Sequence, residues 1–141
     1  MRVCVLAVAT MGALSAAAPA SADPGPVSAP SYAPPFVDHV QWAQWSGLPS
    51  LRVYPTASGR AAAKQLGSPS PEADEAWAEV VGLTPQADTP GMRDQFRCHW
   101  DFAETVEPGK TSWNLEPWRP VADAATMVAT GCNPGGPRES F

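Results

Sequence analysis

Two segments rich in apolar and aromatic residues predict a pair of β-strands early in the chain. Residues 37–45 and 51–54 are rich in Val, Trp and Tyr, which favour the pleated surface of a sheet. Residues 46–49 (SGLP) join the two runs, and Pro55 ends the second because proline has no N–H to donate to a neighbouring strand. We therefore expect two antiparallel strands here.

Two helices are predicted after residue 57. A short helix is predicted over residues 58–66, with Gly67 as its end. A second helix is predicted over residues 70–81, because Ser70 is a natural N-cap and Pro71 suits the first helical position. Gly82 is expected to end it. Its apolar positions recur at helical spacing and share one face: Ala73, Ala76, Trp77, Val80 and Val81.

The clearest strand pattern lies at residues 95–102. Apolar side chains at positions 96, 98, 100 and 102 alternate there with polar ones, so one face is expected in the core and the other in solvent. A turn at Pro108-Gly109 leads to a second strand over residues 112–116, with Trp113 and Leu115 pointing inward and Asn114 and Glu116 outward.

The last element predicted is a short helix from Asp123, its N-cap, to Thr130, ended by Gly131. These elements together indicate an α+β fold: a small, mostly antiparallel sheet with one main amphipathic helix packed on it, and one disulfide.

The N-terminus has the pattern of a secretory signal peptide. A basic start (Met1-Arg2) precedes an apolar run over residues 3–14, and Ala20-Ser21-Ala22 forms a small-residue cleavage site before Asp23. The run is too short to span a bilayer, so we expect an exported mature chain without a transmembrane segment. The expected organisation is a signal peptide (1–22), a Pro-rich linker (23–35), a globular domain (36–134) and a flexible tail (135–141).

Charge and cysteine content limit the partners that the chain can bind and the state of its cysteines. The chain has 9 Lys and Arg against 14 Asp and Glu, which disfavours binding to nucleic acid or to an anionic membrane. Cys4 leaves with the signal peptide, and an exported domain meets oxidising conditions, so Cys98 and Cys132 are expected to form a disulfide. The competing hypothesis is a catalytic Cys98 thiol beside His99. Neighbours on a strand point to opposite faces, which disfavours that pairing.

The polar row of the 95–102 strand is the first candidate for chemistry. Arg97, His99 and Asp101 would lie along one face, with Glu116 and Arg119 nearby if the two strands pair. Such a set could perform general acid–base chemistry or stabilise a developing charge. The alternative is a solvated sheet face with cross-strand ion pairs. The chain has 2 His and no metal-ligand spacing, so no metal or cofactor is expected.

The second candidate is aromatic. Of 6 tryptophans, those at positions 77, 100 and 113 fit core positions by periodicity. Trp45 and Trp118 flank a turn or prolines and are harder to bury. With Arg119 they could stack on a sugar ring or anchor a protein partner. The alternative is that they are partly buried structural residues at corners.

Three segments carry a resemblance to a known family: residues 92–99 (MRDQFRCH), 113–120 (WNLEPWRP) and 131–134 (GCNP), with shorter matches at 53–56, 59–60 and 76–81. Over residues 37–135 the chain resembles a family of secreted actinobacterial proteins catalogued as a domain of unknown function. The resemblance implies export and pairing of Cys98 with Cys132, and it carries over no catalytic or binding residue. More loosely, the first two segments resemble C-terminal domains of some exported bacterial toxins.

Two functional hypotheses follow. The first is a non-catalytic exported binding or interaction domain at the cell envelope, whose partner is cell-wall glycan or an envelope protein. The alternative is a small secreted hydrolase or toxin-like effector centred on His99, with Asp101 orienting it and Arg97 or Arg119 stabilising charge. A housekeeping envelope protein without small-molecule chemistry is a third possibility.

Overall fold

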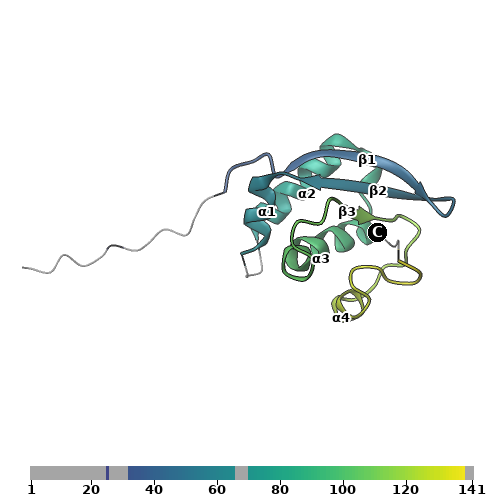
Figure 1. The fold of residues 1–141 in the computed structure, drawn as a ribbon. Helices are drawn as coiled ribbons and strands as arrows, with labels where there is room; N and C mark the ends of the chain where they lie inside the picture. Colours follow the sequence, from purple (N-terminus) through teal and green to yellow (C-terminus); the bar gives the residue numbers. More distant parts are fainter. Residues whose placement is uncertain (1–24, 26–31, 66–69, 139–141) are drawn as a thin grey trace, which may run out of the picture. The chain divides into compact units, whose positions relative to one another are not determined.

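A three-stranded antiparallel sheet, in the order β1-β2-β3, is the centre of the fold (Figure 1). The computed structural model describes residues 25, 32–65 and 70–138. Strands β1 (Val37–Trp45) and β2 (Leu48–Pro55) form the predicted hairpin. The turn residues Ser46 and Gly47 both have positive φ, 50° and 77°, which suits a two-residue hairpin turn between twisted strands.

The third strand comes from much later in the chain. β3 (Trp113–Leu115) pairs with the middle of β2, where Leu115 lies opposite Leu51 and Trp113 opposite Val53. This pairing makes β2 the central strand and leaves β1 at an edge of the sheet. The two strand pairings and the helices confirm the predicted α+β class.

Within the described part of the chain, four α-helices and one 3₁₀ turn complete the fold: α1 (Ala57–Ala63), α2 (Pro71–Leu83), η1 (Pro85–Ala87), α3 (Pro90–Val106) and α4 (Ala124–Ala129). Side-chain caps fix where all four α-helices begin, and Thr56 Oγ1 caps α1 by accepting from the N–H of Gly59 at 2.9 Å. Ser70 Oγ accepts from the N–H of Ala73 at 3.2 Å, and Asp123 Oδ1 accepts from that of Thr126 at 2.7 Å, as predicted. Thr89 Oγ1 caps α3 in the same way.

The core lies where α2 and α3 pack against the sheet. Phe96 is at its centre, and its ring centroid lies between 5.4 and 6.1 Å from those of Trp77, Trp100 and Trp113. α2 contacts β1, α3 contacts β3, and the two helices contact each other. The apolar face predicted for the 70–81 helix is therefore used as expected, with Trp77 buried against α3.

The prediction of a strand over residues 95–102 is wrong, because these residues belong to α3. Thr89 and Pro90 start the helix with a side-chain cap and a proline at its first turn. The apolar alternation was misleading, since a helix buries positions three or four apart. Most of the side chains that α3 buries follow that spacing, among them Met92, Gln95, Phe96, His99, Trp100 and Ala103.

Two smaller predictions also need correction. α2 runs through Gly82 to Leu83, because Thr84 is its C-cap. Asn114 and Glu116 are buried instead of facing solvent, because both are held in hydrogen bonds inside the domain. The predicted helix stop at Gly67 lies outside the described residues.

The ends of the predicted domain are more firmly attached than the composition suggests. Ser58 Oγ donates to the carbonyl oxygen of Ala33 at 2.6 Å, so the last residues of the predicted linker contact α1. Within the predicted flexible tail, the carbonyl oxygen of Pro137 accepts a hydrogen bond from Arg119 Nη2 at 2.8 Å. The predicted signal peptide lies outside the described residues. Among the helices that the structure describes, none is long and apolar enough to cross a membrane.

Candidate functional site

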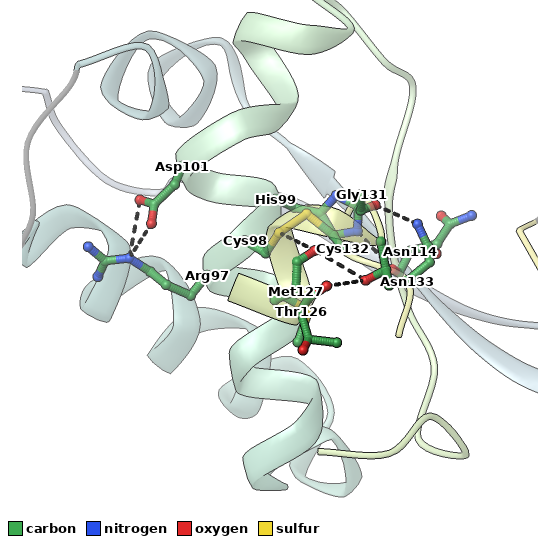
Figure 2. Close-up of a disulfide and its surroundings, with 11 residues drawn as sticks. Arg97, Cys98, His99, Asp101, Asn114, Thr126, Met127, Gly131, Cys132 and Asn133 are labelled. Atoms are coloured by element: carbon green, nitrogen blue, oxygen red, sulfur yellow. Dashed lines mark hydrogen bonds and ion pairs between the residues drawn. A yellow bond between two sulfur atoms is a disulfide. The ribbon is translucent and has the colours of Figure 1, made fainter. Parts of the chain in front are cut away.

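The predicted disulfide joins α3 to the loop after α4. Cys98 and Cys132 are bonded, with their Cα atoms 5.6 Å apart (Figure 2). Gly131 and Cys132 both have positive φ, 58° and 67°, which turns the chain back toward α3 immediately after α4. A bonded Cys98 is not a free thiol, so the hypothesis of a catalytic Cys98 is wrong.

His99 is a buried side chain with a defined hydrogen bond. It is 6% exposed, and its Nε2 lies 3.1 Å from the carbonyl oxygen of Asn114. Since a carbonyl oxygen only accepts, Nε2 carries the proton of the neutral ring. Desolvation by burial, reinforced by the positive charge of Lys110, lowers the pKa of His99 to about 4 against the opposing effect of the Asn114 hydrogen bond. The ring is therefore neutral at pH 7.

The predicted polar row of Arg97, His99 and Asp101 does not exist. In an α-helix, residues two positions apart differ by about 200° around the helix axis. His99 therefore points away from the side of α3 that carries Arg97 and Asp101. Arg97 Nε and Asp101 instead form an ion pair at 3.2 Å across one helical turn. Figure 2 shows this pair pointing away from His99. Asp101 therefore orients Arg97, and the geometry needed for His99-centred acid–base chemistry is absent from this helix.

Glu116 and Arg119 form a buried ion pair, with Arg119 Nε 2.8 Å from Glu116 Oε2. Ser50 Oγ donates to the other carboxylate oxygen at 3.0 Å. Gln95 uses its side-chain amide on the backbone of Glu116, donating to the carbonyl at 2.9 Å and accepting from the N–H at 2.8 Å. This network joins α3, β2 and the segment after β3, and it uses Arg119 for structure.

The two tryptophans predicted to be at a binding surface lie together at the end of the hairpin. The Trp45 and Trp118 ring centroids are 6.3 Å apart, with an angle of 24° between the planes. The Arg119 guanidinium carbon lies 4.4 Å from the Trp118 ring, and Trp118 Nε1 donates to the carbonyl oxygen of Pro49 at 3.1 Å. Both tryptophans are half-buried, and Leu48, which pairs with Trp45 across the turn, is exposed. We call Trp45, Leu48 and Trp118 the hairpin cluster.

Arg119 packs against Trp118 of the hairpin cluster. Its side chain is buried, and Nη1 and Nη2 donate to the carbonyl oxygens of Pro134 and Pro137. It therefore has no surface to offer a partner, in contrast to the prediction that it would contact one. The Trp118 ring contacts both this guanidinium and the Trp45 ring, and both tryptophans remain half-buried.

The residues that carry the family resemblance have structural roles in this fold. The side-chain amide of Gln95 bonds to the backbone of Glu116, immediately after β3, and Cys98 forms the disulfide. Arg60 pairs with the buried Glu104 and so connects α1 to α3. Within the described residues, no group of three or more His, Cys, Asp or Glu side chains could hold a metal ion.

Comparison with known proteins identifies the family. The model of a family described as "Protein of unknown function (DUF2599)" matches residues 37–135. The chain belongs to this family. Uncharacterized proteins of Mycobacterium bovis and Mycobacterium tuberculosis are 57% identical to it, over 97% of this chain and 94% of theirs. An uncharacterized protein of Mycobacterium leprae is 51% identical over 75% of this chain and 85% of its own length. No solved structure matches.

Sequence reasoning missed one feature of α3. Cys98, Phe102 and Val106 are four residues apart, so on a helix they form one stripe, and this stripe lines a cavity beside the disulfide. The cap at Thr89 and the proline at position 90 are the signals that could have revealed the helix and hence the stripe.

Proposed function

We propose that this chain is an exported, non-catalytic binding domain that attaches to cell-wall glycan through the hairpin cluster. The observation that carries the proposal is the stacking of Trp45 on Trp118, two residues from distant parts of the chain, beside the exposed Leu48. Aromatic rings of this kind pack on the apolar faces of sugar rings, and half-exposed tryptophans often dominate the binding energy of a surface.

The contacts that hold Trp118 in place favour a binding role for the hairpin cluster over a purely structural one. The Pro49 carbonyl fixes the indole N–H of Trp118, and the buried Arg119 covers its ring, so Trp45 rests on a rigid base. A side chain that is already immobilised loses little conformational entropy when a ligand binds. The acidic composition of the chain is consistent with a neutral partner such as glycan, since it disfavours polyanions.

The export part of the proposal rests on residues 1–22 and on the disulfide, which is typical of proteins that leave the cytoplasm. N-terminal sequencing of protein recovered from culture medium or from the cell wall tests it. A mature chain beginning at Asp23 is expected. Recovery only of chains that retain Met1, inside the cell, would contradict it.

Co-sedimentation of the oxidised mature protein with purified cell wall, across a range of salt, tests binding. Saturable pelleting that persists at high salt is expected, and Trp45→Ala should weaken it at least about tenfold, as for the loss of one dominant aromatic contact. Trp42→Ala is the matched control, because Trp42 is 40% exposed on the same strand but bonds to Thr84 on the α2 side. Equal losses in both variants, or no saturable pelleting, would contradict the proposal.

A further inference from the structure

A cavity of about 180 Å³ lies beside the disulfide, between α3, the loop after it and the segment that follows α4. Its walls are largely apolar. They include the disulfide, Phe102 and Val106 on α3, and Val128 on α4. These three side chains are 41%, 78% and 53% exposed, which is unusual for large apolar residues that lie close together. We call this cavity the disulfide pocket.

The charged side chains around the disulfide pocket are predominantly positive. Lys110 and Arg138 line it together with one carboxylate, that of Glu107, whose Oε2 is 3.3 Å from Lys110 Nζ. The Arg138 guanidinium lies over Gly131, next to the disulfide. His99, on the inner wall, is neutral, and the charges of Lys110 and Arg138 both contribute to lowering its pKa. An apolar cavity with a net positive rim complements a molecule that is apolar at one end and anionic at the other.

We propose that the disulfide pocket binds a small anionic amphiphile: a carboxylate carried by a short alkyl chain. The chain lies along Phe102, Val106 and Val128, and the carboxylate faces Lys110 and Arg138. The volume sets the size of the ligand, because pockets for drug-sized molecules range from about 300 to 1,000 Å³. A cavity of about 180 Å³ accepts one short chain and excludes a two-chain lipid. This site is separate from the hairpin cluster, and its test does not depend on glycan binding.

Three probes with the same eight-carbon chain separate charge from apolar contact. Octanoate, octanol and octyltrimethylammonium are titrated into the oxidised mature protein below their micelle concentrations, and binding is followed by NMR shifts of backbone amides. Octanoate is expected to bind about tenfold more tightly than octanol, because two cations face its headgroup. Octyltrimethylammonium is expected to bind less tightly than octanol. The shifts should centre on residues 98–106 and 128–132.

Two kinds of variant test the two halves of the ligand. Lys110→Gln combined with Arg138→Gln should reduce the affinity for octanoate to that for octanol and leave octanol binding unchanged. Val106→Asn should weaken both, and it is compatible with folding because Val106 is 78% exposed. Arg93→Gln is the matched control, since Arg93 is an exposed arginine of α3 that pairs with Asp74 away from the pocket lining, and it should change neither affinity. Equal affinity for octanoate and octyltrimethylammonium, shifts away from residues 98–106, or no binding of octanoate would each overturn the proposal.

Discussion

Burial of His99 makes the stability of the domain depend on pH in the range where histidine titrates. The side chain is 6% exposed, and burial together with nearby cations lowers its pKa to about 4 in the folded state. In the unfolded chain the value returns to about 6.5. As the pH falls below 6.5 the unfolded state binds a proton that the folded state does not, so the free energy of unfolding decreases.

The size of the effect follows from the two pKa values. The full loss, reached below pH 4, is about 3 kcal/mol, and about 2 kcal/mol of it is expected between pH 7 and pH 5. Contributions from other ionisable groups cancel when two variants are compared at the same pH. Against a total stability of about 5–15 kcal/mol for a domain, this contribution is easily measured.

Urea unfolding at pH 7 and pH 5 checks the prediction in the wild-type protein and in His99→Gln. Glutamine can still donate to the Asn114 carbonyl, and it does not titrate, so the variant should lose about 2 kcal/mol less than the wild type between the two pH values. The reasoning is refuted if wild type and His99→Gln have the same pH dependence, or if an NMR titration of the folded protein gives His99 a pKa near 6.5.

Four further substitutions test the packing of the domain. Cys98→Ser should lower the free energy of unfolding by about 4 kcal/mol, as for opening a loop whose ends are separated by 34 residues, and reduction of the wild type should match it in urea titrations. Arg119→Met leaves a buried carboxylate without its partner and should cost about 3–5 kcal/mol, measured the same way. Gly59→Ala should lower the melting temperature, because a Cβ there overlaps the Phe36 carbonyl, whereas Gly82→Ala should raise the stability by about 0.5–1 kcal/mol, since its helical site has open space. Equal effects of the two glycine changes would contradict this account of the packing.

The hairpin, the 70–81 helix and the disulfide could be predicted because each depends on neighbouring residues or on a single pair of cysteines. Ser70 and Pro71 specify the start of α2 locally, and the Val, Trp and Tyr residues of β1 and β2 favour strands. The family was likewise recognisable from its motifs.

The segment at residues 95–102 could not be assigned from apolar alternation alone. Phe96 and Trp100 are four residues apart, a spacing that fits both the period of a strand and that of a helix. Only the cap at Thr89 distinguishes a helix here. The error then placed Arg97, His99 and Asp101 on one face. The sequence indicated that Trp45 and Trp118 are each hard to bury. It could not indicate that they contact each other, because their proximity depends on tertiary packing.

The pairing of β3 with β2 constrains the order in which the domain can fold. Leu51 must find Leu115, and Ser50 must find Glu116, 66 positions away. Contacts this distant in sequence form late, after local hairpins and helices. A chain that emerges from its N-terminus first therefore cannot complete its sheet until nearly all of it is available. Until then β2 lacks its second neighbour and the side chains of the central strand remain open to water. Partly emerged chains should consequently be the form most exposed to proteolysis and aggregation.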